Sequence, residues 1–397
     1  MIPSVISDHI ARAPTGPPLV VESAGRGRVR LDSAELINMA SCDYLGFARD
    51  PRVTGAAIAA IGEWGLGMAA TRVLSGSTAP HRTLEHRLAR WVGTGDSVLY
   101  GSCWTANAAV FEVLATLARQ AGRTLAVFSD RLNHASIIDG ISAQRKAVSE
   151  LTRYDHDDHA VLVDALGRAP ADALKIVVTD GVFSMEGDQA PLSRLVELTS
   201  AHDALLVVDD SHGIGVLGET GRGTAEAQGA LGQIDIITGT LGKALGGASG
   251  GFVATTPDLV TTMRATARPF IFSNNPPTPV VAGALAALDI LADDPRPLAD
   301  LRARIGGLRE GITRLGLPTV PGEHPIVPVL IGDDVAAHDA ARHLRRHQVF
   351  ATALSHPVVP RGEARLRLQV SVNHSPQDIA EVVEALAGWR RPAGAGR

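Results

Sequence analysis

The chain has 397 residues, of which 45% are hydrophobic and 20% are charged. This length allows more than one domain, and the ordinary composition excludes a disordered or fibrous chain. A formal net charge of -5 offers no broad cationic surface for nucleic acid or anionic lipid. Two cysteines, Cys42 and Cys103, cannot build a disulfide framework or a cysteine metal cluster, and no apolar run is long enough to span a membrane. We therefore expect a folded cytoplasmic protein with no bound metal and no nucleic-acid or membrane partner.

The first 45 residues predict an N-terminal arm. Pro14, Pro17, Pro18 and several glycines interrupt any periodic pattern, so we expect irregular backbone with a β segment near Val29–Leu31. We expect this arm, residues 1–45, to lie against another part of the chain.

Residues 46–275 predict a large α/β domain. Short apolar runs rich in β-branched residues alternate with amphipathic helical segments such as Ala106–Arg119 and Leu192–Ala201. The runs are Ser97–Tyr100, Thr124–Ser129, Leu174–Thr179, Leu205–Val208, Ile234–Thr238 and Gly251–Ala254. Strands that are apolar on both faces are typical of a parallel sheet covered by helices on both sides.

A second domain is predicted after the prolines at 276, 277 and 279. The strand-like run Ile326–Ile331 is followed by a helical segment, Ala336–His347, and by Ala364–Val372, which alternates like a solvated antiparallel strand. We expect a C-terminal α+β domain over residues 276–390. The composition of residues 391–397 predicts a fraying tail.

One lysine lies in a glycine-rich turn between two predicted strands. The segment from Ile236 to Gly251 reads IITGTLGKALGGASGG, with Lys243 near its centre. A nucleotide phosphate loop would need Ser or Thr after the Gly-Lys pair, whereas Ala244 follows here. A plain structural turn is the other interpretation, but so many glycines are entropically costly for a mere connection. We interpret Lys243 as a positioned functional group.

Polar side chains follow three other predicted strands. Asp209 ends the run LLVVD and precedes His212, and His134 and Ser184 follow two neighbouring strands. Ligands of open α/β sheets bind at these strand ends, where a carboxylate can keep a heterocyclic nitrogen protonated. A metal pair or a Walker-B-like strand is an alternative for Asp209, and a histidine such as His134, taken alone, is more often a helix cap or a core residue.

The segment YDHDDH at Tyr154–His159 has metal-ligand residue types. Asp157 or Asp158 is better explained as the N-cap of the amphipathic run that follows. We therefore predict a helix start here rather than a metal site.

The strand-end carboxylate, the later lysine and the earlier histidine together resemble a fold-type I pyridoxal phosphate enzyme. The strings TDGVFSMEGD, VDDSHGIG, DIITGTLGKALGGASGGF, RPFIFSNNPP and PVVPRGEARLRLQVSVNHS resemble those of the α-oxoamine synthases, over nearly the whole chain. Among subfamilies, GTLGKALGGASGG and FSN are most similar to the 2-amino-3-ketobutyrate CoA ligases, or glycine C-acetyltransferases. The resemblance implies the pyridoxal-phosphate-dependent transferase fold type I, with a mostly parallel seven-stranded sheet in the large domain.

The resemblance implies roles around the pyridoxal 5'-phosphate ring. Lys243 would bind the cofactor covalently and Asp209 would pair with the pyridine nitrogen. His212 and Ser184 would contact the ring oxygen, and His134 would stack over the ring. Lys243 and His134 would be the catalytic residues.

The phosphate would be held by the turn of Ser102, Cys103 and Trp104 at a helix N-terminus, whose N–H groups and dipole suit an anion. Thr240 would add a contact, and Ser273 would reach the phosphate of the other subunit. A homodimer with shared active sites is therefore implied.

On the substrate side, Arg367 would bind the amino-acid carboxylate, as a bidentate guanidinium can. One position departs from the family, which has Asn two residues before the Tyr of its NDYLG or NNYLG string. This chain has Cys42 there, before Tyr44, and a thiol is a poor replacement for an amide donor. The departure bears on the substrate more than on the cofactor.

The implied activity is condensation of a small amino acid, expected to be glycine, with an acyl thioester, expected to be a short acyl-CoA. The product would be an aminoketone or a 2-amino-3-keto acid. An enzyme like 8-amino-7-oxononanoate synthase, or a specialised-metabolism relative that uses an acyl-carrier-protein thioester, is an alternative. From another class, an aminotransferase would share the lysine and the aspartate.

Overall fold

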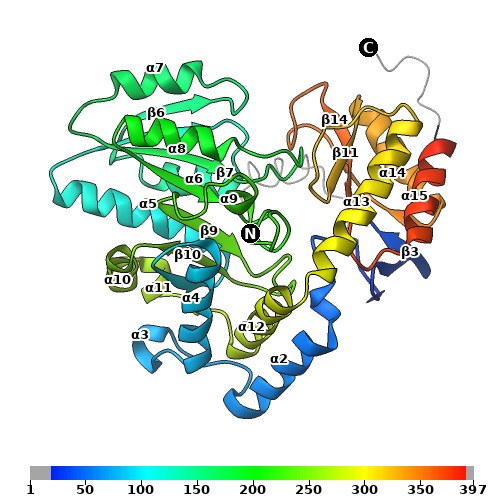
Figure 1. The fold of residues 1–397 in the computed structure, drawn as a ribbon, viewed down its shortest axis with the longest axis horizontal. Helices are drawn as coiled ribbons and strands as arrows, with labels where there is room; N and C mark the ends of the chain where they lie inside the picture. Colours follow the sequence, from blue (N-terminus) through cyan, green and yellow to red (C-terminus); the bar gives the residue numbers. More distant parts are fainter. Residues whose placement is uncertain (1–18, 390–397) are drawn as a thin grey trace, which may run out of the picture.

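The structure is a computed structural model that describes residues 19–389 (Figure 1). The beginning of the expected arm and the expected tail lie outside the described residues.

A seven-stranded sheet organises the larger part of the molecule (Figure 1). Its order is β4-β10-β9-β8-β7-β5-β6, and β10 runs antiparallel to both of its neighbours while the remaining pairs are parallel. The strands are β4 (Asp96–Tyr100), β5 (Leu125–Asp130), β6 (Val148–Tyr154), β7 (Leu174–Asp180), β8 (Ala204–Asp209), β9 (Ile236–Thr240) and β10 (Gly251–Thr255). The prediction of a mostly parallel seven-stranded sheet is confirmed.

The central strands are buried on both faces because helices cover both. In β7, Ile176 and Val178 pack into one core with α5, whereas Val177 between them packs into the other. The helices of this part include α5 (Cys103–Gln120), α6 (Ala135–Ala143), α7 (Ala160–Arg168), α8 (Leu192–Ala201), α9 (Thr224–Ala227), α10 (Pro257–Thr266) and α11 (Arg268–Ile271). The continuous apolar runs in the sequence arise from this two-sided burial.

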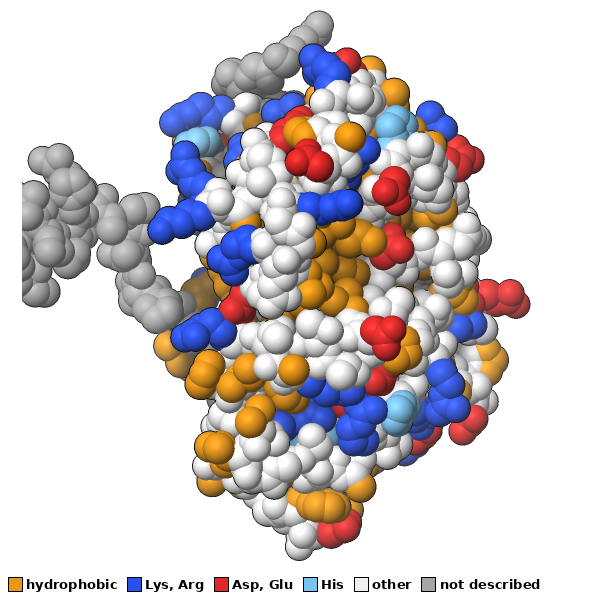
Figure 2. Space-filling view, turned by 90° about the vertical axis from the view of Figure 1, so that its left-hand side faces the viewer, with side chains coloured by type: hydrophobic (Ala, Val, Ile, Leu, Met, Phe, Trp, Pro, Cys, Tyr) orange, Lys and Arg blue, Asp and Glu red, His pale blue; other side chains and the backbone are white. Residues whose placement is uncertain are grey.

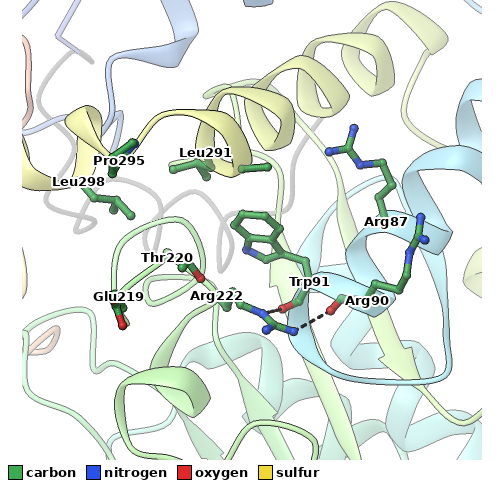
Figure 3. Close-up of a pocket in the computed structure, with 10 residues that line it drawn as sticks. Arg87, Arg90, Trp91, Glu219, Thr220, Arg222, Leu291, Pro295 and Leu298 are labelled. Atoms are coloured by element: carbon green, nitrogen blue, oxygen red, sulfur yellow. Dashed lines mark hydrogen bonds between the residues drawn. The ribbon is translucent and has the colours of Figure 1, made fainter.

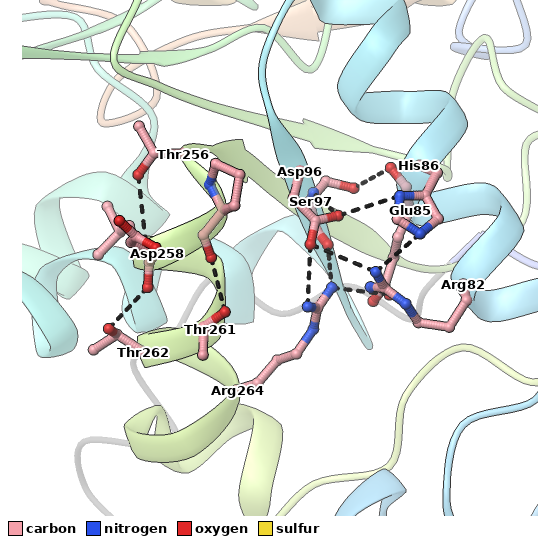
Figure 4. Close-up of polar contacts among 12 residues, drawn as sticks. Arg82, Glu85, His86, Asp96, Ser97, Thr256, Asp258, Thr261, Thr262 and Arg264 are labelled. Atoms are coloured by element: carbon pink, nitrogen blue, oxygen red, sulfur yellow. Dashed lines mark hydrogen bonds and ion pairs between the residues drawn. The ribbon is translucent and has the colours of Figure 1, made fainter.

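A buried charge cluster fixes one end of the sheet against three helices: α3 (Arg72–Ser75), α4 (Ala79–Val92) and α10 (Figure 4). Glu85 is fully buried and accepts hydrogen bonds from Arg72 Nη1 at 2.6 Å and from Leu99 N at 3.0 Å. Arg264 reaches Glu85 Oε2 at 3.2 Å and Asp96 Oδ2 at 3.1 Å. Burial would raise the pKa of Glu85, but the arginines outweigh burial and lower it. Removing one partner would leave a buried charge unpaired and would lower the free energy of unfolding by about 3–5 kcal/mol.

The C-terminal part contains a three-stranded antiparallel sheet in the order β11-β14-β13. Its strands are β11 (Ile326–Gly332), β13 (Thr352–Leu354) and β14 (Ala364–Gln369), and its helices are α13 (Arg296–Arg314), α14 (Asp334–Arg346) and α15 (Pro376–Gly388). The prediction that Ala364–Val372 is a solvated strand is wrong, because β14 is the central strand and is buried along most of its length. Its alternating polar residues have partners within the protein instead: Arg365 Nη1, for example, donates to Glu186 Oε1 at 2.9 Å.

The described part of the N-terminal arm is ordered. It forms β1 (Ser23–Ala24), β2 (Arg28–Leu31) and β3 (Ala34–Asn38), so the β segment expected near Val29 is confirmed. β3 pairs in parallel with β12 (Val349–Phe350), which comes from the C-terminal part. The arm therefore belongs structurally with the C-terminal α+β unit, while the domain boundaries themselves remain predictions.

Two further helices, α2 (Pro51–Trp64) and α12 (Thr278–Asp293), run beside each other between the two parts, and η1 (Phe47–Arg49) precedes α2 (Figure 1). On the face shown in Figure 2, Lys and Arg side chains are interspersed with Asp and Glu, and hydrophobic side chains line a hollow. Within residues 19–389, no helix combines the length and apolar character needed to cross a membrane.

Candidate active site

A cavity of about 230 Å³ lies where β5, β7, β8 and β9 end. Eight residues predicted from the sequence line it: Cys103, Trp104, His134, Ser184, Asp209, His212, Thr240 and Lys243. Ser136, Asp180 and Ser211 also line the cavity and were not predicted. The sheet thus brings together residues that are far apart in the sequence, as strand ends of an α/β sheet do.

Asp209 is one of two buried carboxylates in this cavity. It ends β8 and accepts hydrogen bonds from Asn107 Nδ2 at 2.7 Å and from Ser211 N at 3.0 Å. The thiol of Cys103 lies 3.5 Å from its Oδ2. Burial and the nearby charge of Asp209 raise the pKa of Asp180 well above its ordinary value. The cavity therefore holds Asp209 beside a second buried carboxylate, Asp180.

Lys243 lies in the loop that joins β9 to β10. The loop closes through Leu241 N and Thr240 Oγ1, which donate to Gly250 O at 2.9 and 3.2 Å. Gly251 then packs so closely on the start of α5 that a Cβ there would lie 2.3 Å from Cys103 N. Glycine is required at this contact, which places the lysine loop beside the helix N-terminus.

The first residues of α5, Cys103 and Trp104, line the cavity. Ser102 forms a capping box in which its Oγ accepts from Thr105 N and Thr105 Oγ1 accepts from Ser102 N. As at any helix start, the first N–H groups of α5, those of Cys103 and Trp104, have no carbonyl four residues earlier within the helix. N–H groups at the positive end of a helix of 18 residues suit a phosphate group.

His212 is held as a neutral ring. Its Nδ1 lies 2.9 Å from Tyr44 Oη, and its backbone oxygen lies 3.0 Å from His324 Nε2. Burial first, and then the charge of Lys243, lower the pKa of His212 well below its ordinary value. A neutral His212 can share a hydrogen bond with a ligand oxygen.

Arg367 on β14 reaches this region from the C-terminal part. Its Nη1 donates to Ser184 O at 3.0 Å, while its Nε is buried and has no hydrogen-bond partner in the described chain. The guanidinium therefore keeps an unused buried donor, which a carboxylate ligand would satisfy.

Cys42 lies outside the cavity that contains Lys243. It lines a neighbouring cavity of about 200 Å³ that also touches the lysine loop at Gly242 and Gly247. Its thiol donates to Gln369 Oε1 at 3.0 Å, and the same oxygen accepts from Tyr44 Oη at 3.2 Å. Gln369 was not predicted, because nothing in a strand sequence marks one glutamine as a partner.

Ser273 does not line the cavity that contains Lys243. It is exposed and follows α11 directly after Phe272. Its contact with the cofactor phosphate of another subunit remains a prediction.

The segment 154–159 forms an ion-pair cluster. His156 lies between Asp130 Oδ2 at 3.4 Å and Asp188 Oδ2 at 3.3 Å, and its ring stacks on Phe183. The helix expected here is α7, but its N-cap is His159 rather than Asp157 or Asp158; Asp158 Oδ1 still accepts from Ala160 N. In the part of the chain that the structure describes, no group of His, Cys, Asp and Glu is arranged to hold a metal ion.

We expect the stabilising effect of His156 to disappear at high pH. Burial alone would lower its pKa, but the two carboxylates outweigh burial and raise it to about 10. A raised folded-state pKa stabilises fully below the unfolded value of about 6.5, and this contribution declines as pH rises toward 10. The difference in unfolding free energy between the native protein and His156→Gln should therefore shrink between pH 6.5 and 10 in denaturant titrations. A constant difference over that range would contradict the ion pairing.

A larger cavity, of about 550 Å³, lies between α4, the junction of α12 and α13, and the loop at 219–222 (Figure 3). Trp91 faces Leu291 there, and the guanidinium of Arg222 donates to the backbone oxygens of Trp91 and Arg90 (Figure 3). None of the residues predicted for the site lines this cavity. Chemistry, rather than volume, identifies the smaller cavity as the candidate active site.

Residues 34–386 match the family of aminotransferases class I and II. The chain belongs to this family. It is 39% identical to 2-amino-3-ketobutyrate coenzyme A ligase from Escherichia coli (strain K12), over 92% of this chain and 90% of that protein. It is 44% identical to 8-amino-7-oxononanoate synthase from Anaeromyxobacter sp. (strain K), over 90% of this chain and 87% of that protein.

Solved structures give the same result. A serine palmitoyltransferase from S. paucimobilis with PLP and myriocin has a TM-score of 0.87 and 29% identity, with 97% of this chain and 96% of that chain covered. The resemblance to the α-oxoamine synthases is thereby confirmed. This member of the class I and II family is a pyridoxal-phosphate-dependent acyltransferase of fold type I.

The described residues fit that cofactor. The cavity combines a buried acceptor carboxylate, one lysine and a helix N-terminus, which match a pyridine nitrogen, an aldehyde and a phosphate.

Proposed function

We propose that this α-oxoamine synthase joins a small amino acid, glycine in the simplest case, to the acyl group of a short acyl-CoA. The observation that carries the proposal is Arg367, whose unused buried donor lies beside Ser184 at the edge of the lysine cavity. An amino acid bound there would have its carboxylate fixed while its amine faces Lys243. The relatives named as 2-amino-3-ketobutyrate coenzyme A ligases support this choice of substrates.

We assign the cofactor contacts as the sequence implies them. Lys243 binds the cofactor covalently, Asp209 pairs with the pyridine nitrogen, His134 stacks on the ring, and His212 and Ser184 hold the ring oxygen. The phosphate contacts are assigned to Ser102, Cys103, Trp104 and Thr240. When bound, the cofactor supplies an electron sink that stabilises negative charge on the substrate Cα.

The chain's own groups then have distinct tasks. Asp209 keeps the ring nitrogen protonated, and Asn107 and Ser211 N fix its carboxylate for that purpose. The Lys243 amine takes the proton from the substrate Cα, and Arg367 holds the carboxylate while the acyl group arrives.

Two other activities are weighed against this one. The 44% identity to an 8-amino-7-oxononanoate synthase favours a longer acyl group, delivered by CoA or an acyl carrier protein. An aminotransferase would use the same lysine and carboxylate but would form no carbon–carbon bond.

A thiol-release assay distinguishes these activities. The holoenzyme is mixed with glycine, alanine or serine and with acetyl-CoA, pimeloyl-CoA or an acyl carrier protein thioester. We expect the fastest thiol release with glycine and acetyl-CoA. Preference for alanine with a pimeloyl thioester would support the alternative synthase, and amino transfer to a 2-keto acid without thiol release would refute the synthase proposal.

We also propose a homodimer with shared active sites. Large apolar side chains near Ser273 are exposed, including Phe272 at 68% and Leu74 at 82%, and Trp104 beside the cavity is also exposed. Such side chains are typical of a surface that a second copy covers. Light scattering should give twice the chain mass, and Phe272→Asp should lower both the dimer fraction and the affinity for the cofactor. A fully active monomer at assay concentration would contradict this proposal.

Cys42→Asn is expected to tighten glycine binding. The native thiol is a weak donor to Gln369 Oε1, whereas an amide donates more strongly and restores the family's polar contact. We expect a gain of about 1–3 kcal/mol in glycine affinity, with cofactor attachment unchanged, measured by spectroscopic titration with glycine, alanine and serine. Cys42→Ser is the matched control for size. If Cys42→Asn binds glycine no better than the native protein, the cysteine is a neutral replacement.

A further inference from the structure

Asn107 is a buried amide on α5 that no cofactor contact explains. Its side chain is 2% exposed and meets three partners from three other elements. Nδ2 lies 2.7 Å from Asp209 Oδ2 and 2.8 Å from Ser136 Oγ, and Oδ1 lies 2.8 Å from Thr238 Oγ1. These contacts satisfy both amide protons and the amide oxygen.

The chemistry of the partners fixes the orientation of this amide. The carboxylate oxygens of Asp209 accept from Ser211 N and from Asn107, so the amide nitrogen faces this side chain. Oδ1 then faces Thr238, whose hydroxyl must donate. The second amide proton points to Ser136 Oγ, which therefore acts as an acceptor toward Asn107.

The hydrogen-bond network continues from Ser136 to His134. The backbone N–H of Ser136 donates to His134 Nδ1 at 3.2 Å, which makes Nδ1 an acceptor. Ser136 Oγ lies 2.8 Å from the same nitrogen, so its own proton points there while its lone pair accepts from Asn107. With two donors aimed at it, Nδ1 must carry a lone pair, and the ring proton of the neutral imidazole lies on Nε2.

The packing of α6 on α5 makes the relay possible. Gly140 of α6 lies so close to α5 that a Cβ there would be 2.8 Å from Phe111 and 3.3 Å from Asn107 O. This approach brings Ser136, one turn earlier on α6, within reach of the amide.

We propose that Asn107 is a positioning residue that orients the Asp209 carboxylate and, through Ser136, holds His134 as its Nε2–H tautomer. The inference rests on the proposed roles of Asp209 and His134 toward the cofactor. The Asn107 amide thereby links Asp209, which pairs with the pyridine nitrogen, to His134, which stacks on the ring. His134 is uncharged in this arrangement, in agreement with its pKa, which burial lowers, with Asp209 opposing and Lys243 adding to the effect.

Two measurements on the full-length holoenzyme test the proposal. The first is the dissociation constant of pyridoxal phosphate, from the fluorescence change on cofactor release. The second is the tautomer of His134, from ¹⁵N histidine spectra in which the His134→Gln variant assigns the signal. Neither depends on which amino acid or thioester is used, so failure of the thiol-release assay would leave both intact.

The variants are Asn107→Leu, Ser136→Ala and Thr238→Val. Ser142→Ala is the matched control on α6, because its hydroxyl bonds only to the helix backbone at Ile138 O, and Thr199→Val is the buried threonine control on α8. Asn107→Leu is expected to weaken cofactor binding by about tenfold or more, and Thr238→Val by less. Asn107→Leu and Ser136→Ala should both give a measurable Nδ1-protonated population of His134, and the two controls should give none.

If Nδ1 stays fully unprotonated in both variants, the backbone N–H of Ser136 alone sets the tautomer and the relay is wrong. An unchanged dissociation constant in Asn107→Leu would overturn the link to Asp209. Should Asn107→Leu fail to fold, Ser136→Ala and Thr238→Val decide the same two questions separately, since each removes one contact of the amide.

Discussion

Lys243→Ala is expected to abolish both covalent attachment of the cofactor and catalytic turnover. The chain has only three lysines, at positions 146, 175 and 243, and of these only Lys243 lines the candidate cavity. Borohydride reduction of the native holoenzyme should add the cofactor mass to one peptide, the one that contains Lys243. In the alanine variant, the visible absorbance band and the added mass should both be missing.

The two remaining lysines give matched controls. Lys175 Nζ donates to His202 O at 2.9 Å, away from the cavity, so Lys175→Ala costs one hydrogen bond and leaves the cofactor in place. Lys146→Ala should change neither the covalent attachment of the cofactor nor the catalytic turnover. Normal turnover by Lys243→Ala, or labelling at either other lysine, would end the assignment.

Asp209→Ala is expected to weaken cofactor binding by about two to four orders of magnitude, because it removes one member of a buried charged pair worth about 3–5 kcal/mol. Turnover should fall further, since a ring nitrogen without its proton is a poorer electron sink. Equilibrium dialysis gives the affinity and single-turnover kinetics give the rate. The Asn107 amide would also lose its acceptor. The losses of cofactor affinity caused by Asp209→Ala and Asn107→Leu should therefore not be additive in the double variant.

Asp210, the residue after Asp209, provides a control for the Asp209 substitution, and only the structure shows that it does. Asp210 points away from the cavity and accepts from Thr224 Oγ1 at 2.6 Å and Thr224 N at 2.8 Å, with burial raising its pKa to about 7. Asp210→Asn should lower stability while cofactor affinity stays within about threefold of native. Equal losses from both substitutions would show that general destabilisation, not the ring contact, explains the Asp209 result.

The sequence predicts well those features that depend on local order along the chain. The buried strands are continuous apolar runs, and a polar residue directly after such a run falls at the strand end that lines a cavity. Asp209, His134 and Ser184 were therefore predictable, and Lys243 was predictable from its glycine-rich turn, whereas the turn at the start of α5 came from the family resemblance.

Features that depend on contacts between distant segments were not predictable. Asn107 lies inside a helix and Gln369 inside a strand, where neither amide differs in pattern from a solvated one. The alternation in Ala364–Gln369 has the same periodicity whether its arginines face water or a carboxylate of the protein such as Glu186, so the pattern alone led to the wrong environment. Only the fold decides between these environments.

The pairing of β3 with β12 has a consequence for how the protein is made. Ile37 of β3 can pair with Val349 of β12 only after about 310 further residues have been synthesised. At ordinary rates of translation, this synthesis takes roughly 15 to 60 seconds. The seven-stranded sheet lies wholly within Asp96–Thr255 and can assemble on the ribosome during that interval. Val29, Leu31 and Leu36, which pack against Phe350 in the finished protein, stay uncovered throughout. The nascent chain therefore presents an apolar hairpin to the cell's chaperones until its last segment emerges, and a ribosome stalled before residue 349 would hold the hairpin without its partner strand.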